Sequence, residues 1–179
     1  VINGKWYYME TSTGVMKTGF FRDANGGLYY SDGSGAMVGN PGWNVIGGKW
    51  YWMNSNGSIY SGWLSRPSGW YYLNADGSMA TGWAKVGNTW YYMNGSGAMQ
   101  TGWVKTASGW YYLTGSGAMA TGWYVVGGNW YYSNSDGTMQ TGWVKVGNNW
   151  YYMDGSGAMA ANRWIGNYYV TGSGAMATN

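Results

Sequence analysis

The chain contains no cysteine and no histidine among its 179 residues. Their absence excludes disulfides, thiolate nucleophiles, imidazole bases and the commonest zinc ligands. Proline and phenylalanine occur twice each, and only 8% of the residues are charged. No apolar run approaches the roughly 20 residues that a membrane helix requires. The sequence therefore predicts no metal, no cofactor and no membrane insertion.

The few charges are also thinly spread. The chain has nine lysines and arginines and six aspartates and glutamates, and the lysines recur about once per 20 residues, as at Lys85, Lys105 and Lys145. A nucleic-acid footprint normally gathers its basic residues into one patch. We interpret these lysines as solvated surface residues and expect no nucleic-acid partner.

Aromatic residues and glycine dominate what is present. Aromatic residues make up 20% of the chain, which argues against disorder in spite of 34 glycines. Tryptophan recurs in two interlocked series with a spacing of 20 residues, which indicates one small unit stacked many times. The two series are Trp43, Trp63, Trp83, Trp103, Trp123 and Trp143, and Trp50, Trp70, Trp90, Trp110, Trp130 and Trp150.

The quality of the repeat divides the chain into three parts. Residues 41–160 hold regular units, such as TGWVKTASGWYYLTGSGAMA at 101–120. Residues 1–40 hold degenerate units, in which Phe20 and Leu28 replace the two tryptophans, and residues 161–179 hold a shortened unit with Trp164 displaced and Asn167 at the second tryptophan position. Degenerate terminal repeats are typical of a stacked array, so we expect one array over 1–179. Because the sequence begins inside a repeat, we expect it to be part of a longer protein.

Each unit has the pattern of a β-hairpin. A short run at 83–86 and a second run at 90–93 are separated by Gly87-Asn88, residues that supply the positive φ angles of tight hairpin turns. A Gly-rich connector at 94–97 then leads to the next unit. Because a lone hairpin is marginal in water, each one must pack on the next. We predict an all-β fold, a solenoid of stacked hairpins with about 20 residues per repeat.

Strand alternation sorts the rings of each unit into two sets. Trp90 and Tyr92 point one way, and Tyr91 and Met93 the other, so one set can form the core while the other stays available. Several rings with few acidic neighbours suit a weakly hydrated cation such as a quaternary ammonium, bound at roughly 0.5–2 kcal/mol per cation–π contact. Many weak sites along one array would attach it firmly to a polymer that carries many cations.

At these residues the sequence resembles a known family. Two tryptophans seven residues apart, the second in Trp-Tyr-Tyr-(Met/Leu), followed by a Gly-x-Met-x-Thr-Gly-Trp segment, resemble the choline-binding repeat of Gram-positive surface proteins and of phage or autolytic cell wall hydrolases. The resemblance covers essentially the whole chain. It implies a left-handed β-solenoid outside the cell, associated with the wall, that binds phosphocholine on teichoic and lipoteichoic acids.

In that family a site lies between consecutive repeats and uses two tryptophans of one repeat, a tyrosine of the next and a nearby Met or Leu. We assign the second tyrosine of each triplet because it has the parity of the tryptophan, and the first tyrosine remains open. Met79, Met99, Met119, Met139 and Met159 could wall the sites, but core packing is the favoured interpretation. The resemblance assigns Trp43, Trp50 and Tyr72; Trp63, Trp70 and Tyr92; Trp83, Trp90 and Tyr112; Trp103, Trp110 and Tyr132; Trp123, Trp130 and Tyr152; and Trp143, Trp150 and Tyr169.

The sequence leaves three other hypotheses. Tryptophan and tyrosine faces also stack on sugars, and related repeats occur in glucan-binding regions of glucosyltransferases and in clostridial toxins, although those are richer in phenylalanine. Catalysis by the chain itself is disfavoured, because its carboxylates lie mostly in Gly-rich turns and suggest no acid–base pair; a catalytic domain of a wall hydrolase would lie outside it. A homodimer formed through a terminal repeat is compatible with the main hypothesis. The carboxylates are Glu10, Asp23, Asp32, Asp76, Asp136 and Asp154.

Overall fold

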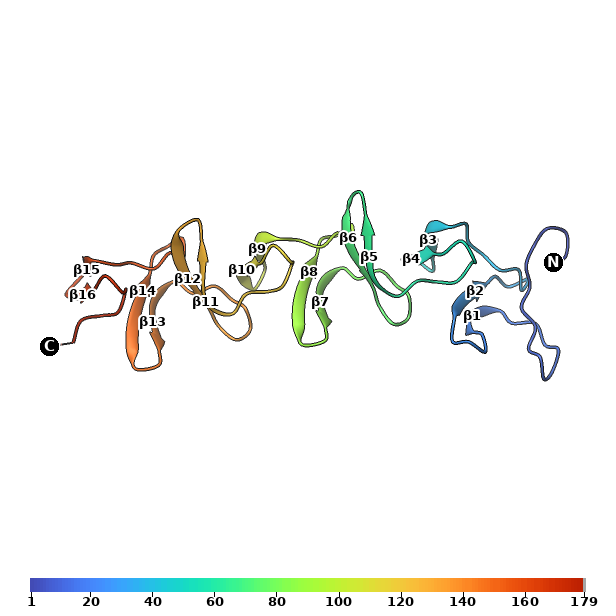
Figure 1. Ribbon diagram of the computed structural model, residues 1–179, viewed down its shortest axis with the longest axis horizontal. Helices are drawn as coiled ribbons and strands as arrows, with labels where there is room; N and C mark the ends of the chain where they lie inside the picture. Colours follow the sequence, from blue (N-terminus) through green and yellow to red (C-terminus); the bar gives the residue numbers. More distant parts are fainter. Residues whose placement is uncertain (179) are drawn as a thin grey trace. The chain divides into compact units, whose positions relative to one another are not determined.

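The computed structural model describes residues 1–178, and the regular structure in this part of the chain consists of β-strands without a helix. This confirms the predicted all-β fold of hairpins that recur about every 20 residues. The strands, shown in Figure 1, are β1 (Gly19–Arg22), β2 (Leu28–Ser31), β3 (Gly42–Ile46), β4 (Lys49–Met53), β5 (Gly62–Arg66), β6 (Gly69–Leu73), β7 (Gly82–Val86), β8 (Thr89–Met93), β9 (Gly102–Thr106), β10 (Gly109–Leu113), β11 (Gly122–Val126), β12 (Asn129–Ser133), β13 (Gly142–Val146), β14 (Asn149–Met153), β15 (Arg163–Ile165) and β16 (Tyr168–Val170).

Contacts between Cα atoms divide the chain into two compact units. Unit 1 consists of Val1–Ala84 and Met93–Met99, and unit 2 consists of Lys85–Tyr92 and Gln100–Asn179. The division falls within β7 and β8. The expected parts at 1–40, 41–160 and 161–179 describe the quality of the repeat, and they remain a prediction from sequence.

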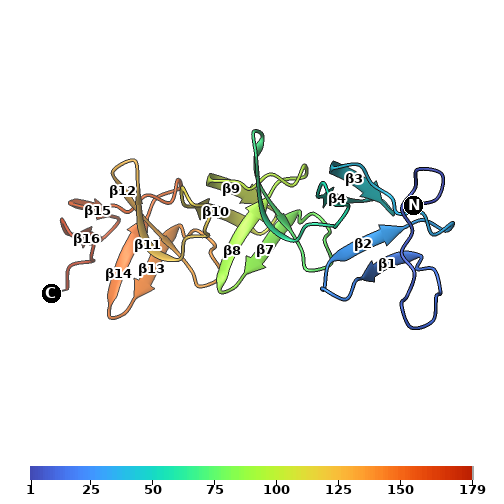
Figure 2. The ribbon, with the colours of Figure 1, turned by 45° about the vertical axis from the view of Figure 1, so that its right-hand side comes forward.

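Within each unit the strands pair as separate antiparallel hairpins. In unit 1, β1 pairs with β2, β3 with β4 and β5 with β6; in unit 2, β9 pairs with β10, β11 with β12, β13 with β14 and β15 with β16. Figure 2 shows the β1–β2 pair in blue and the β13–β14 pair in orange as distinct two-stranded ribbons. Most of the paired strands have five residues, and a turn of two residues joins them.

The Gly-Gly turns have the backbone angles that their glycines predict, whereas in the Gly87-Asn88 turn only Gly87 has the expected positive φ, of 59°. Gly47 and Gly48 between β3 and β4 have φ angles of 56° and 77°. Positive φ at both central residues matches the twist of the flanking strands. A side chain at either position would be strained, which explains the Gly-Gly pair.

The connector after each hairpin holds two hairpins at a fixed spacing. The Met139 N–H donates to the Trp110 carbonyl of the preceding hairpin at 2.8 Å, and the next residue, Gln140, donates to Tyr132 of its own hairpin at 2.8 Å. Two successive N–H groups of one connector therefore bind two neighbouring hairpins. The same arrangement recurs at Met79 and Ala80 and at Met159 and Ala160.

The core follows the alternation of the second strand of each hairpin. Leu73 is fully buried and Tyr71 is nearly so, whereas Trp70 between the turn and Tyr71 is 48% exposed. Fully buried residues occupy the position after the aromatic triplet along the chain, at Met53, Leu73, Met93, Leu113, Ser133, Met153 and Val170. In β6 the first tyrosine and this residue thus form the packed face of the strand, and the tryptophan lies on the open face.

Candidate functional site

The open face of a hairpin with both tryptophans carries three aromatic side chains. In β11–β12, Trp123 pairs with Tyr132 and Val125 pairs with Trp130, so Trp123, Trp130 and Tyr132 lie on one face of the hairpin. The ring centroids of Trp123 and Trp130 are 6.2 Å apart at 81°, and those of Trp123 and Tyr132 are 5.1 Å apart at 62°. The two indoles therefore meet edge to face and form a corner.

The second tryptophan of each pair is open to solvent. Trp130 is 47% exposed and Trp150 is 40% exposed, while Trp123 and Trp143 are half-buried. Large exposed apolar surfaces that recur at a fixed position mark binding sites more often than packing. The corner between the two indoles is therefore accessible to a ligand.

The first tryptophan of a pair, such as Trp123, also contacts a tyrosine ring of the next hairpin. The centroid of Trp123 lies 4.7 Å from that of Tyr151, at 71°. Equivalent pairs are Trp43 with Tyr71 at 5.1 Å, Trp103 with Tyr131 at 4.8 Å and Trp143 with Tyr168 at 5.6 Å. In each pair the tyrosine is the first of its triplet.

Parity favours the second tyrosine at this place and leaves the first tyrosine open, and in these four pairs it is the first tyrosine that lies beside the tryptophan. Tyr132, Tyr152 and Tyr169 instead pair across their own hairpins with Trp123, Trp143 and Trp164. Tyr72 and Tyr112 do the same with Trp63 and Trp103. Parity correctly grouped each second tyrosine with the tryptophans of its own repeat. A site between hairpins, however, takes its third ring from the opposite face of the next hairpin, and the first tyrosine lies on that face.

A methionine completes the arrangement at the C-terminal end. A cavity of about 370 Å³ is lined by Trp143, Trp150, Tyr168 and Met176. The Met176 N–H donates to the Trp150 carbonyl at 2.7 Å, which places the methionine beside the exposed indole. We call this set of two tryptophans, the first tyrosine of the next hairpin and the following methionine an aromatic cage.

The methionines expected mainly in the core are half-buried at these positions. The backbone N–H groups of Met159 and Met139 donate to the carbonyl groups of Trp130 and Trp110, as that of Met176 does to the carbonyl of Trp150. A Cβ on Gly157 would lie 2.4 Å from the Met139 sulfur, and Gly157 has φ of 85°. Glycine is thus required twice at this point, for its backbone angle and for the space that the methionine occupies.

The ring arrangements built on Trp43, Trp103, Trp123 and Trp143 each lie within one unit, and their assignment as binding sites stays a prediction. The residues assigned to the other two sites are divided between the two units, and those sites stay predictions as well. They comprise Trp63, Trp70 and Tyr92, and Trp83, Trp90 and Tyr112.

The interval after β1–β2 is closed by aliphatic side chains. Leu28 occupies the position of the second tryptophan in the regular repeats, and Ile59 occupies the position of their methionine. The Ile59 N–H donates to the Leu28 carbonyl at 2.6 Å. Ile59 and Tyr51 are buried in one cluster, against which Leu28 packs. This interval is therefore a core.

The ring of Trp52 carries a cation supplied by the chain. The guanidinium carbon of Arg66 lies 3.6 Å from the ring centroid of Trp52. Trp52 pairs with Trp43 on the open face of its hairpin, at a centroid distance of 5.4 Å. The contact shows that this aromatic face accommodates a planar cation at van der Waals distance.

The carboxylates serve the connectors. Asp154 accepts hydrogen bonds from Ser156 N at 2.8 Å and Ala158 N at 3.1 Å, and the Ser156 hydroxyl is the main reason why the pKa of Asp154 lies below its ordinary value. The pKa values of Asp32 and Asp76 are lowered chiefly by Ser34 and Ser78 in the same way. Within residues 1–178 no group of His, Cys, Asp and Glu could hold a metal ion.

No helix long and apolar enough to cross a membrane occurs among the described residues. The lining of the Trp143 cage offers rings, a thioether and access to solvent, which are groups that bind a ligand.

Comparison with protein families accounts for nearly the whole sequence. The choline-binding repeat matches residues 41–81, 80–121, 120–164 and 158–179. A putative cell wall binding repeat matches residues 2–16 and 18–37. No curated protein matches the chain.

Several solved structures are similar over almost the entire chain. CbpJ from Streptococcus pneumoniae TIGR4 is 38% identical with a TM-score of 0.81, and choline binding protein F from Streptococcus pneumoniae, solved in the presence of a peptidoglycan analogue, is 37% identical with a TM-score of 0.80. Each comparison covers 96% of this chain and 61% of the other protein. The modular autolysin LytC from the same species is 34% identical with a TM-score of 0.65, over 97% of this chain and 40% of LytC. The chain thus spans less than two thirds of the length of these proteins.

Proposed function

The chain belongs to the choline-binding repeat family, and on that premise we propose that it is a non-catalytic module that anchors an attached domain to a cell wall by binding choline groups. The observation that supports this function most directly is the cage of Trp143, Trp150, Tyr168 and Met176. Its lining has no charged side chain and stays open to solvent.

The chemistry of the cage suits a quaternary ammonium. A trimethylammonium group cannot donate hydrogen bonds, so a site gains nothing from offering it acceptors. Ring faces attract its diffuse positive charge at roughly 0.5–2 kcal/mol each, and the methionine buries its methyl groups. Three rings give an affinity in the millimolar to micromolar range, on the order of a few kcal/mol.

We assign the third wall of each cage to the first tyrosine of the following triplet. The proposed sites within single units are Trp43, Trp50 and Tyr71; Trp103, Trp110 and Tyr131; Trp123, Trp130 and Tyr151; and Trp143, Trp150 and Tyr168.

Repetition supports a polymeric partner. Weak sites at a fixed spacing on one chain bind a polymer through effective concentration, so the whole array can exceed one site by about 10²–10⁴ in apparent affinity. Teichoic and lipoteichoic acids that carry phosphocholine are the polymers of this kind on Gram-positive walls. The attached domain we propose is a wall hydrolase or an adhesin, in a protein that acts outside the cell or on the wall.

The C-terminal hairpin β15–β16 supports a further hypothesis, dimerisation through a terminal repeat. Trp164 is 68% exposed and Tyr168 is 55% exposed. Light scattering of the chain with and without choline tests this, because a dimer formed through this hairpin would dissociate after Trp164→Ser.

Retention on agarose that carries covalently attached choline tests the proposed function. We expect the chain to be retained and to elute with free choline, and Trp130→Ala with Trp150→Ala to elute earlier because both residues are exposed and their loss removes two cages. Elution by sodium chloride at the same ionic strength as the choline would contradict the proposal.

A further inference from the structure

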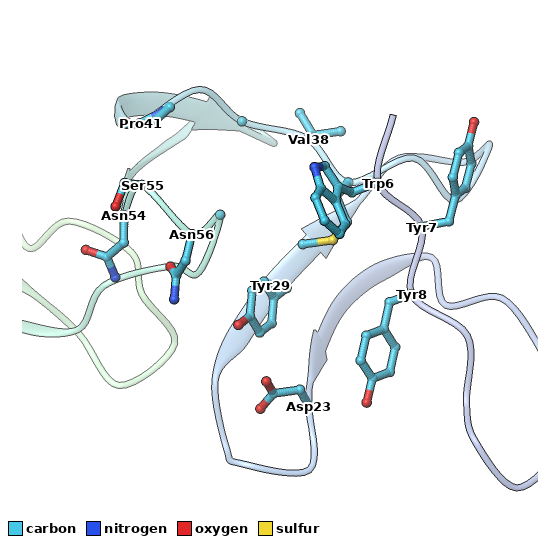
Figure 3. Close-up of a pocket in the computed structure, with 13 residues that line it drawn as sticks. Trp6, Tyr7, Tyr8, Asp23, Tyr29, Val38, Pro41, Asn54, Ser55 and Asn56 are labelled. Atoms are coloured by element: carbon cyan, nitrogen blue, oxygen red, sulfur yellow. The ribbon is translucent and has the colours of Figure 1, made fainter. Parts of the chain in front are cut away.

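A second kind of pocket lies in unit 1 beside β1–β2. It encloses about 690 Å³ and is lined by Trp6, Tyr8, Asp23, Tyr29, Met37 and the segment 54–57. Figure 3 shows Tyr29 between Trp6 and Asp23, with Asn54 and Asn56 across the opening. No sequence argument assigned a site to these residues.

Three of its residues occupy the positions of a cage. The Met37 N–H donates to the Trp6 carbonyl at 2.8 Å, as that of Met176 does to Trp150 at 2.7 Å. Tyr29 pairs with Phe21, the third residue of β1, as the first tyrosines of other hairpins pair with the third residue of their first strand. Trp6 is 67% exposed, so its ring is accessible like the second tryptophan of a cage.

The difference from a cage is a carboxylate. Asp23 Oδ1 accepts hydrogen bonds from the N–H groups of Asn25 at 3.0 Å and Gly27 at 2.7 Å, which fixes the side chain within the β1–β2 turn. A Cβ on Gly27 would lie 2.9 Å from the Tyr29 ring and 3.2 Å from Asp23 Oδ1. Glycine is therefore what allows the carboxylate and the phenol ring to lie together.

The charge of Asp23 has no partner of opposite sign. Among the described residues the one ion pair within 4.0 Å joins Lys17 and Glu10. The neighbouring Arg22 points its guanidinium at carbonyl oxygens, those of Gly26 at 2.8 Å and Ala75 at 3.2 Å. Burial raises the pKa of Tyr29, and the charge of Asp23 and its hydrogen bond with the Tyr29 side chain raise it further.

We propose that the pocket of Trp6, Tyr29 and Asp23 is a cation site for a primary alkylammonium group, which it binds in preference to a quaternary one. The –NH₃⁺ group donates three hydrogen bonds and can satisfy the carboxylate, while the rings of Trp6 and Tyr29 attract its charge. A trimethylammonium group would cover the carboxylate without donating to it, which is costly. The inference goes beyond the proposed function, since it assigns a different ligand to a different pocket.

A primary ammonium could belong to an ethanolamine substituent or to a lysine side chain of a peptide. The two sources differ in the group that carries the ammonium, a short phosphorylated alcohol in one and a longer alkyl chain in the other. Phosphoethanolamine and Nα-acetyl-lysine amide therefore serve as separate probes, with inorganic phosphate as the control for anion binding.

The test is indole N–H NMR of the full chain, with the Trp6 signal identified by its loss in Trp6→Phe. Saturating choline is added first to fill the cages, and each primary amine is then titrated. We expect the Trp6 signal to shift with at least one amine and not with phosphate. Asp23→Asn, which keeps the oxygen that accepts the backbone hydrogen bonds, should weaken this binding by about ten-fold through loss of a charge-assisted hydrogen bond.

Asp154→Asn is the matched control, because Asp154 also accepts backbone hydrogen bonds in a turn but lies outside the pocket. It should leave the Trp6 titration unchanged. Absence of a Trp6 shift, equal affinity in Asp23→Asn, or saturation of Trp6 by choline alone would overturn the inference. The response of Trp123 and Trp130 to choline in the same spectra decides the proposed function separately.

Discussion

The hydroxyl groups of Tyr124 and Ser133 lie 2.9 Å apart across the β11–β12 hairpin, where a methionine, leucine or valine follows the aromatic triplet in most units. Ser133 is fully buried, and burial raises the pKa of Tyr124, so the phenol remains a protonated partner. The Tyr124 ring stacks on Tyr112 of the preceding hairpin at 5.4 Å and 11°. A larger ring in one strand and a smaller residue in the other thus fill the same core space.

The β1–β2 hairpin has the same serine without the phenol. Ser31 is fully buried and its Oγ has no hydrogen-bond partner, and Phe21 stands where β11 has Tyr124. Phe21→Tyr should raise the free energy of unfolding by about 1 kcal/mol because it supplies the missing partner, and Tyr124→Phe should lower it by about the same amount. Urea denaturation measures both. A loss of stability in Phe21→Tyr would contradict the equivalence of the two positions.

The third wall of the cage is tested at Trp123. Tyr151→Leu should weaken choline binding at the Trp123 and Trp130 indoles by about three- to thirty-fold, the range expected for one lost cation–π contact. Tyr152→Leu should leave binding at these two indoles unchanged, because Tyr152 pairs with Trp143 within the next hairpin. Indole NMR during a choline titration reads each site separately. The reverse pattern would restore the second tyrosine as the wall.

Lysine beside the exposed tryptophan should set a preference for phosphocholine. The Lys105 ammonium lies 5.7 Å from the ring centroid of Trp110, and the corresponding position beside Trp130 is Val125. Lys105→Val should reduce the preference of its site for phosphocholine over choline by about two- to five-fold, the size of an exposed charge pair.

The reciprocal change, Val125→Lys, should create the same preference at Trp130. Both effects should shrink as salt is raised, because exposed charges are screened. Equal ratios of the two affinities in all three proteins would show that the lysines do not contact the phosphate.

Binding and stability should depend differently on pH. Tryptophan and methionine do not titrate and the chain has no histidine, so choline affinity should stay constant between about pH 5 and about pH 9. Because the pKa values of Asp32, Asp76 and Asp154 are lowered in the folded chain, these carboxylates stabilise it at pH values above about 4, the ordinary pKa of aspartate in an unfolded chain. This stabilisation is lost as the pH falls through the lower pKa values of the folded chain. The thermal midpoint should therefore drop in acid. In Asp154→Asn this drop should be smaller.

Much of this architecture could be predicted from the sequence because it is local. The period of the tryptophans fixes the repeat, Gly-Gly turns such as Gly47-Gly48 fix the hairpins, and strand alternation correctly separates Trp70 from Tyr71. These features depend on neighbours within about 20 residues, where spacing alone carries the information.

The sequence does not predict which residues of consecutive hairpins contact one another. Parity describes one hairpin and does not say which face of the next one approaches, so the sequence favours Tyr152 and leaves Tyr151 open, and the ring of Tyr151 is the one that lies beside Trp123. The sequence does not predict the Asp23 pocket, because a carboxylate in a Gly-rich turn indicates only a local role. The intact Trp-Tyr-Tyr at residues 6–8 was the available signal for a site there.

A titration with choline chloride, followed by tryptophan fluorescence and by the thermal midpoint, tests the central claim most directly. Ammonium chloride at the same concentration and an oligosaccharide serve as controls. The cages predict a saturable fluorescence change and a raised midpoint with choline alone, since a ligand that binds only the folded chain stabilises it. A response to the oligosaccharide without one to choline would contradict the claim and place the module among the glucan-binding repeats.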